Sequence, residues 1–230
     1  REGKPIAAPA PVTGLRQLGW SQDGRTGHGD NGRHSWFDRR SGESQGSPTI
    51  APPNSEAAMS LNGELIAVSK FDGIAELRDP KTGHELDIII GPEGEVPGGV
   101  ALSRDAQWIA MQAGYPDEPG SLGVYQVSDR QQVWRVDDLP RLARPAVLAF
   151  SPSNRWLAAA LPDGSVQVRH ARIGGGLRVL RKSWREPADQ LAARDQLAFC
   201  IAGSHLAVVA NDVRVYSMLQ PDRVVEFPHE

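Results

Sequence analysis

The sequence predicts an all-β fold made of repeated four-stranded antiparallel sheets, and three observations support this prediction. Residues 147–180 contain four short apolar or alternating segments, which are separated by polar or glycine-rich turns such as Asp163-Gly164 and Gly174 to Gly176. Three hairpin turns in about 35 residues leave room only for an antiparallel meander. The same pattern recurs on both sides of this stretch, and its recurrences are regularly spaced.

The spacing of the recurrences indicates the architecture. Each unit starts at a small residue, and these five starts are Ser21, Ser60, Ser103, Ser151 and Cys200. Their separations of 39, 43, 48 and 49 residues are at or just beyond the roughly 40 to 45 residues of a four-stranded propeller blade. An alanine stands seven residues after each of the last four starts, at Ala67, Ala110, Ala158 and Ala207. A small residue suits the crowded inner part of sheets arranged radially, so we expect a β-propeller with about five blades.

The units can be placed in order along the chain. Residues 1–14 are rich in proline and small residues and predict an extended arm, and residues 15–230 form the propeller. The expected blades lie near 18–50, 57–92, 99–138, 146–182 and 197–228. In the first unit, residues 25–33 are polar and glycine-rich where the other units are apolar, so either this unit is degenerate or residues are absent from it. The third unit is expected to carry a long insertion from Gln112 to Gly123.

Five units could close a small propeller or belong to a six- to eight-bladed one. We favour the larger propeller, because a chain that begins at Arg1 rather than Met suggests a segment taken from a longer protein.

These units resemble the WD40 family of β-propellers. The resemblance covers about residues 15–227 and is carried by the pattern x-Ser-x-Asp/Asn-Gly-x-x-Leu/Ile-Ala, followed by Asp-Gly and an alternating strand. It implies that an aspartate between the second and third strands supports each blade, at Asp72, Asp163 and Asp212. The family's Trp-Asp pair survives only as Phe37-Asp38 and Arg78-Asp79, and its Gly-His pair is missing. The resemblance is therefore to divergent, bacterial members, and it implies a non-catalytic scaffold or sensor domain.

Composition excludes several classes of function. A net charge of -3 gives no global reason to expect nucleic acid, and no apolar run approaches the roughly 18 residues that cross a bilayer. The single cysteine, Cys200, excludes an internal disulfide framework, and its position at the start of a unit predicts a small buried hydrophobic residue. We expect a cytoplasmic protein without cofactors, and the periplasm remains an alternative.

The lengths of the connections predict which face binds a partner. In a propeller meander, the turn between strands two and three and the connection between blades emerge on one side, and the expected long segments all fall there: Ser44 to Glu56, Gln112 to Gly123, Asp137 to Ala146 and Arg181 to Gln196. Long loops on a rigid scaffold concentrate binding residues. We expect this face to bind a protein, or another part of the same polypeptide, through aromatic, basic and acidic residues. These are Tyr115, Asp117, Glu118, Arg141, Arg144, Trp184 and Arg185.

Motifs for catalysis or metal binding are weak. His28, Asp30 and His34 could in principle hold a metal ion, but their glycine-rich setting predicts a simple hairpin, and we expect no metal site. The basic cluster between Arg169 and Arg185 is the best argument for a polyanion, yet alternation along strands would send its side chains to different faces. The alternative function is small-molecule or hydrolytic chemistry in the central channel. The expected first strands supply few ionisable residues for it, so we do not expect an enzyme.

Overall fold

The structure is a computed structural model. It describes residues 17–20, 26–30, 34–38, 56–80, 82–92, 94, 96–115, 118–140, 145–161, 163–181, 196–209, 213–220 and 224–227. In the first three of these segments only the backbone strands are described.

The described residues form five antiparallel sheets, and in each the strands pair in sequence order. The first sheet contains β1 (Gln17–Trp20), β2 (Thr26–Asp30) and β3 (His34–Asp38). The second contains β4 (Ala57–Met59), β5 (Ile66–Ser69), β6 (Ile74–Arg78) and β7 (Glu85–Ile90), with a short 3₁₀ helix η1 (Phe71–Gly73) between β5 and β6. The third contains β8 (Val96–Leu102), β9 (Trp108–Gly114), β10 (Gly120–Gln126) and β11 (Gln132–Leu139).

The last two sheets repeat this plan. The fourth contains β12 (Val147–Phe150), β13 (Trp156–Ala160), β14 (Val166–His170) and β15 (Arg178–Arg181). The fifth contains β16 (Gln196–Phe199), β17 (His205–Val209), β18 (Val213–Ser217) and β19 (Val224–Phe227).

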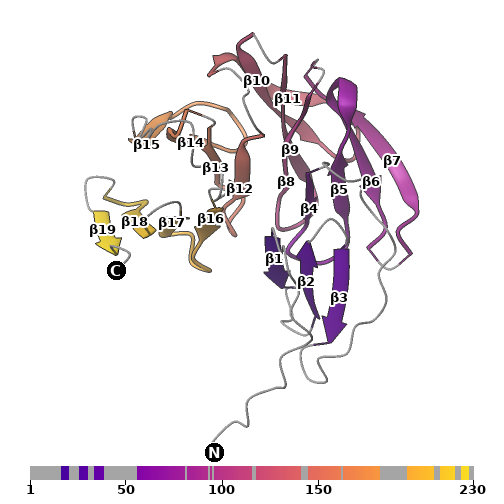
Figure 1. Cartoon of the computed structure of the whole chain (residues 1–230), viewed down its shortest axis with the longest axis horizontal. Coiled ribbons are helices and arrows are strands. Elements are labelled where there is room, and N and C mark those ends of the chain that lie inside the picture. Colours follow the sequence, from indigo (N-terminus) through magenta and orange to yellow (C-terminus); the bar gives the residue numbers. More distant parts are fainter. Residues whose placement is uncertain are drawn as a thin grey trace, which may run out of the picture.

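The sheets are arranged as the blades of a β-propeller. Their first strands lie next to one another, with β8 between β4 and β12, and β12 between β8 and β16. Figure 1 shows the sheets following one another around an open arc, with the first sheet at one end and the fifth at the other. This confirms the predicted all-β propeller of four-stranded antiparallel blades, and we refer to the sheets as blades one to five.

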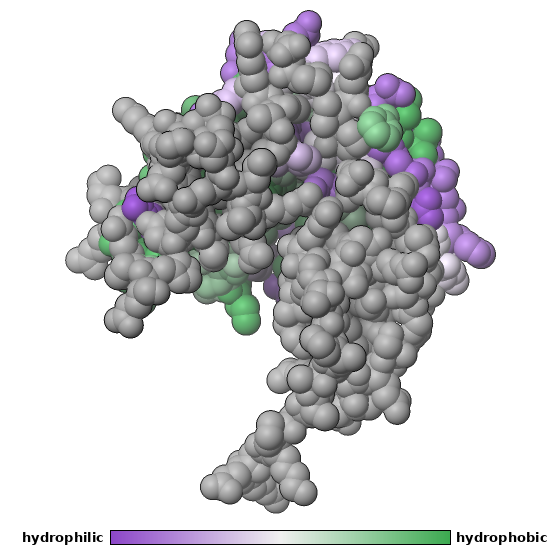
Figure 2. All heavy atoms as spheres, in the orientation of Figure 1, coloured by the Kyte–Doolittle hydropathy of each residue, from purple (hydrophilic) through white to green (hydrophobic). Residues whose placement is uncertain are grey.

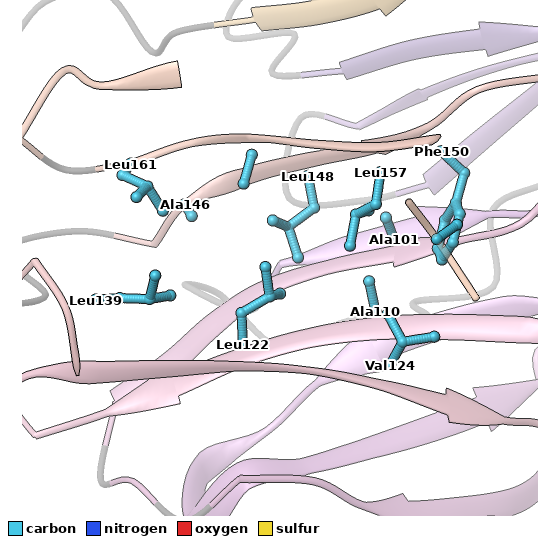
Figure 3. Packing of buried hydrophobic residues seen from close by; sticks show 12 residues of the cluster. Ala101, Ala110, Leu122, Val124, Leu139, Ala146, Leu148, Phe150, Leu157 and Leu161 are labelled. Atoms are coloured by element: carbon cyan, nitrogen blue, oxygen red, sulfur yellow. The ribbon is translucent and has the colours of Figure 1, made fainter. Parts of the chain in front are cut away.

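Apolar layers between neighbouring blades form the core. Between blades three and four, side chains of both sheets point toward one another, as Figure 3 shows for Leu122 and Val124 on one side and Leu148 and Leu157 on the other. Each fully buried leucine or valine of this kind stabilises the fold by about 1.5 to 3 kcal/mol relative to an exposed one. Ala67, Ala110 and Ala158, each seven residues after a start, lie in these layers and are completely buried. The packing therefore explains why the sequence repeats a small residue there.

The repeated start residues close the turn between the first and second strands in blades two to five. In blade four, the Oγ atom of Ser151 accepts a hydrogen bond from the backbone N–H of Trp156 at 3.0 Å, and the backbone N–H of Ser151 donates to the Trp156 carbonyl at 2.8 Å. Ser60 and Ser103 make the same bonds in blades two and three. Since all three serines are fully buried, these bonds satisfy backbone groups that water cannot reach. The hydroxyl explains the recurrence of serine in the pattern.

A second repeated feature of blades two to five is a left-handed residue three positions after the start. The four residues with this positive φ are Gly63 (73°), Ala106 (58°), Asn154 (55°) and Gly203 (67°). Glycine and asparagine adopt this conformation readily, whereas alanine pays a steric cost. The turn geometry therefore accounts for three of the four residue choices and identifies Ala106 as a strained exception.

In the first unit, the glycine-rich stretch contains β2, which pairs with both β1 and β3 in a three-stranded sheet. One expectation about the third unit needs correction. The expected insertion from Gln112 to Gly123 is largely sheet, because β9 continues to Gly114 and β10 begins at Gly120. Only residues 115–119 remain as a connection. The extra length of this unit therefore lengthens a blade and does not form a loop.

Candidate protein-interaction face

The two sides of the propeller carry different connections. The loop face is the side that carries the connection between the second and third strands of each blade and the connection from one blade to the next. The turn face is the opposite side. Antiparallel strands that alternate in direction place these connections on the same side in every blade. Among the described residues, the loop face therefore includes residues 115, 118–119, 140, 145–146, 161 and 163–165, and the turn face includes residues 103–107, 151–155 and 171–177.

Blade three extends beyond its neighbours at the loop face. Its strands have 7, 7, 7 and 8 residues, whereas those of blade four have 4, 5, 5 and 4. The extension carries the hairpin tip at residues 115–119, where the backbone N–H of Glu118 donates to the Tyr115 carbonyl at 3.3 Å. The Tyr115 side chain is 36% exposed, and Glu118 is exposed. A ring and a carboxylate are thus presented on a sheet-supported hairpin.

A buried glutamine fixes the base of this extension. The Oε1 atom of Gln112 accepts hydrogen bonds from the backbone N–H of Ala146 at 2.7 Å and from that of Gly99 at 3.3 Å. Gln112 lies on β9, Gly99 on an irregular part of β8, and Ala146 on the connection to blade four. The side chain is only 3% exposed, so these bonds are shielded from water and strengthened by the low local dielectric. Gln112 thereby links three separate segments beneath the loop face.

Close backbone approach supports the same region. A Cβ atom on Gly98 would lie 1.6 Å from the carbonyl oxygen of Gln112. Only glycine lets β8 pass this close to β9, and the pairing of these two strands is irregular between Pro97 and Val100. The sequence shows two adjacent glycines here, which could have signalled a bulge; nothing local in the sequence identifies Gln112 as their partner.

Two of the seven expected partner-binding residues lie in the described part of the chain. Tyr115 and Glu118 are together at the tip of the β9–β10 hairpin. The other five lie outside the described residues: Asp117, Arg141, Arg144, Trp184 and Arg185. Arg141 and Arg144 belong to the connection between Leu139 and Val147, whose two ends both lie at the loop face.

The three expected turn aspartates have different positions. The Oδ1 atom of Asp163 accepts hydrogen bonds from the backbone N–H of Ser165 at 2.9 Å and from its hydroxyl at 2.7 Å. This side chain closes the turn between β13 and β14. Asp72 lies in η1 with a left-handed φ of 60°, and its side chain is exposed. Asp212 lies outside the described residues. Asp163 and Asp72 thus shape equivalent turns in different ways, one through its side chain and the other through its backbone.

Hydrogen bonds connect the turns of adjacent blades on the turn face. The backbone N–H of Asn62 donates to the Arg104 carbonyl at 3.0 Å, and the backbone N–H of Arg104 donates to Oδ1 of Asn154 at 3.0 Å. Blades two, three and four are therefore joined through groups that could otherwise contact a partner.

Three arginines of the basic cluster have described side chains that pack within the fold. Arg172 lies over the ring of Trp108, with its guanidinium 5.4 Å from the ring centroid. Arg178 lies over Trp156 at 5.1 Å and donates from Nη1 to the Met218 carbonyl at 2.7 Å. Arg169 is half-buried, and burial lowers the pKa of its guanidinium. These contacts join blades three, four and five, so the three arginines stabilise the fold and do not form one open basic patch.

The first strands of the blades contain no ionisable residue. Their sequences are QLGW, AAM, VPGGVAL, VLAF and QLAF. Ala58, Ala101 and Leu148 on these strands are buried. Among the described residues, no group of three or more His, Cys, Asp or Glu side chains could hold a metal ion. His28 and Asp30 lie on β2 and His34 on β3, where side chains are not described.

Cys200 differs from its expected role. It is not a buried hydrophobic residue, since its side chain is only partly covered. Its Sγ atom lies 3.5 Å from the Ser204 hydroxyl and accepts a hydrogen bond from the backbone N–H of His205 at 3.3 Å. The Ser204 hydrogen bond is the largest cause that lowers the pKa of the thiol, to about 6. The sequence pattern places Cys200 at a serine position, but the polar turn around it becomes evident only in the structure.

Sequence reasoning also missed an apolar surface on the outer strand of blade two. Leu86, Ile88 and Ile90 point to one side of β7 and are 58%, 40% and 68% exposed. In Figure 2, green apolar atoms lie beside purple hydrophilic ones on the outer rim in the region of β7. The alternation of these residues was visible in the sequence, but the sequence did not show that β7 lies at the outer edge of its sheet.

Comparisons with known proteins support the fold only. No protein-family model matches the chain, and no curated protein matches it. The chain is similar to a solved structure of hydrazine synthase from Kuenenia stuttgartiensis, with a TM-score of 0.62 and 16% sequence identity, over 99% of this chain and 70% of that chain. At this identity the likeness concerns the fold and carries no activity to this chain, and the WD40 relationship remains a resemblance. None of the helices in the described parts is long and apolar enough to cross a membrane.

Proposed function

We propose that this propeller is a non-catalytic scaffold or sensor domain that binds a protein through its loop face. The observation that carries the proposal is the asymmetry between the two faces. The loop face has an extended blade that presents Tyr115 and Glu118. The buried side chain of Gln112 joins the base of this blade to Gly99 and Ala146 by hydrogen bonds. The turn face uses short turns that bond to one another. A rigid scaffold that presents irregular segments on one side is the usual arrangement of a binding surface.

The chemistry of the proposed surface is mixed. Tyr115 supplies a ring with a polar tip, and Asp117 and Glu118 supply negative charge beside it. Arg141 and Arg144 belong to the next connection on the same face. Tyrosine and arginine are enriched among residues that dominate interface energies. We therefore propose a partner surface that offers both an apolar pocket and charged groups, on a separate protein or on another part of the same polypeptide.

Catalysis in the central channel has less support. An enzyme of this architecture would need acids, bases or metal ligands on the innermost strands. The first strands of this chain offer none. This absence concerns the strands alone, and it favours the scaffold over the alternative of hydrolytic chemistry. We further propose a role within a larger bacterial signalling or defence protein in the cytoplasm.

Substitution followed by a binding assay tests this function. We expect Tyr115→Ala, Arg141→Ala and Trp184→Ala each to weaken capture of the partner, by about tenfold for the strongest residue. Gln107→Ala is the matched control, because Gln107 is exposed on the turn face. Partners captured by the unaltered chain would be identified by mass spectrometry and measured again with each purified variant. Equal binding by all three variants, or loss of binding with Gln107→Ala alone, would place the site elsewhere.

A further inference from the structure

The outer strand of blade two has an exposed edge. Among the described strands, β7 pairs with β6 alone, and Figure 1 shows it at the outer rim of the arc. The backbone N–H of Gly91, directly after β7, points inward and donates to the Gly73 carbonyl at 2.8 Å. N–H groups alternate in direction along a strand, so those of Ile88 and Ile90 point outward, away from β6. An edge of this kind is a template on which another extended chain can pair.

The side chains beside this edge favour pairing with a second copy of the same strand. Ile88 and Ile90 are 40% and 68% exposed, and isoleucine has a high strand propensity. Antiparallel pairing of two β7 strands around Ile88 would set the two Ile88 residues opposite one another and Ile90 opposite Leu86. The outward N–H of each Ile88 would then meet the Ile88 carbonyl of the other copy. Asp87 would lie opposite Ile89, so no like charges would meet.

The outer strand of blade three is protected differently. Arg135 and Asp137 on β11 are exposed and paired, with Nε of Arg135 donating to Oδ1 of Asp137 at 2.6 Å. The pairing of β11 with β10 also has two register shifts. Charged side chains and irregular pairing are two ways in which proteins protect sheet edges. In β7 the one register shift lies near its first residue, and the exposed side chains at Ile88 and Ile90 are apolar.

A carboxylate occupies the outward N–H of Ile88. The Oδ1 atom of Asp87 accepts a hydrogen bond from this N–H at 2.8 Å. Its Oδ2 atom accepts hydrogen bonds from Nε of Arg130 at 2.9 Å and from Nη2 of the same guanidinium. The Arg130 hydrogen bond is the largest cause that lowers the pKa of the Asp87 carboxyl, and the Ile88 hydrogen bond lowers it further. The N–H on which pairing of two β7 strands would be centred is therefore already bonded, and a negative charge lies beside it.

Arg130 reaches this edge from the neighbouring blade. It belongs to the turn between β10 and β11 and is 43 residues from Asp87 in the sequence. Its φ of 61° is left-handed, a conformation that costs arginine more than glycine or asparagine. The local geometry of the turn therefore gives no reason for an arginine, whereas the contact with Asp87 does.

We propose that Asp87, held by Arg130, protects the edge of β7 and keeps two copies of this chain from pairing through it. Blade three holds the carboxylate in place, and the carboxylate blocks the N–H of Ile88. Breaking this contact leaves an apolar strand with a free hydrogen-bonding edge. The role is separate from partner binding at the loop face, because Arg130 belongs to a turn on the opposite side of the propeller.

Sedimentation velocity over a range of protein concentrations tests this role. We expect Asp87→Ala to self-associate at about tenfold lower concentration than the unaltered chain, because the N–H of Ile88 is then free and the charge is gone. Asp137→Ala is the matched control, since Asp137 is also an arginine-paired aspartate on an outer strand. Asp87→Ala combined with Ile88→Lys should behave as the unaltered chain does, because pairing around this position would set two lysines opposite one another. Circular dichroism would verify that each variant is folded.

Each outcome decides the question. Association of Asp87→Ala that the added Ile88→Lys reverses supports the proposal. If Asp87→Ala associates no more readily than the unaltered chain, the carboxylate does not prevent pairing and the proposal is overturned. Equal association of Asp137→Ala overturns it as well, because loss of any surface charge would then be enough. Association that persists in the double variant also overturns it, since the copies would then be meeting elsewhere.

Discussion

The turn face and the loop face are built from the same strands, yet they are stabilised in different ways. On the turn face, each blade repeats one local device: a start residue such as Ser151 bonds the residue five positions later. Neighbouring turns on that face also bond one another, as Arg104 does to Asn154. On the loop face, the Gln112 side chain of blade three bonds the backbone of Ala146, which is 34 residues away. The turn face is therefore built from a turn that several blades repeat, whereas the loop face is shaped by hydrogen bonds found in blade three. The predictions below test this contrast.

The largest effect is expected at Gly98. Gly98→Ala would place a Cβ atom 1.6 Å from the Gln112 carbonyl oxygen, and the strands must separate to avoid it. We expect a loss of about 3 kcal/mol in the free energy of unfolding, measured by urea denaturation. Gly175→Ala on the turn face is the control, since a Cβ atom there would lie 3.8 Å from the Ile173 side chain. Equal effects of the two substitutions would mean that the close approach of β8 and β9 is not structurally important.

A smaller loss of stability is expected when the hydrogen bonds that Gln112 accepts are removed. Gln112→Leu keeps the approximate volume of the side chain but leaves the buried N–H groups of Gly99 and Ala146 without their acceptor. We expect about 2 kcal/mol of destabilisation, together with faster hydrogen exchange at these two amides. Gln107→Leu on the turn face should change neither quantity. If exchange at Ala146 stayed slow in Gln112→Leu, another group would have to hold the connection.

A stabilising change is expected on the turn face. Ala106→Gly relieves the left-handed strain of Ala106, and we expect a gain of about 0.5 kcal/mol after the entropy cost of glycine in the unfolded chain. The reciprocal substitution is Gly203→Ala, at the same position of blade five with a φ of 67°. It should destabilise by about 1 kcal/mol. Thermal unfolding of both variants gives the two changes in melting temperature, which should have opposite signs. Changes of the same sign would show that the two turns are not equivalent.

The last prediction concerns Cys200, which replaces serine at the start of blade five. Its folded pKa of about 6 is below the roughly 8.5 of an unfolded cysteine, so the unfolded chain binds more protons between these values. Stability relative to Cys200→Ser should therefore rise with pH between about 6 and 8.5, and this contribution is lost as the pH falls toward 6. The alkylation rate of the folded chain should have its midpoint near the same low pKa. Ser204→Ala should move it upward, and a midpoint near 8.5 in the unaltered chain would contradict the assignment.

The repeated part of the fold could be predicted from the sequence because its signals are local. The start residues, the alanines seven positions later and the turn glycines lie within one blade, and their spacing alone indicates four-stranded units. The hydrogen bond of Ser103 to Trp108 spans only five residues. Asp163 closes its turn through Ser165, two residues away. Interactions of this range leave a direct pattern in the sequence.

The loop face was harder to predict because its structure depends on distant contacts. The stretch from Gln112 to Gly123 was interpreted as an insertion, since its glycines and proline interrupt the alternation of a strand. In the structure, these residues extend β9 and β10 because β8 and β11 continue beside them. The Gln112 side chain bonds Gly99 and Ala146, which are 13 and 34 residues away in the sequence. No short motif encodes hydrogen bonds of this range. The partner-binding residues on this face therefore stay predictions.

Site-specific photocrosslinking tests the central claim, that the loop face is the binding surface, most directly. A photoreactive amino acid would replace Tyr115 on the loop face in one variant and Gln107 on the turn face in another. Both positions are solvent-accessible, so the two variants differ mainly in the side of the propeller that they report. We predict that position 115 gives a discrete crosslinked partner and position 107 does not. A partner captured at position 107, with none at position 115, would contradict the account.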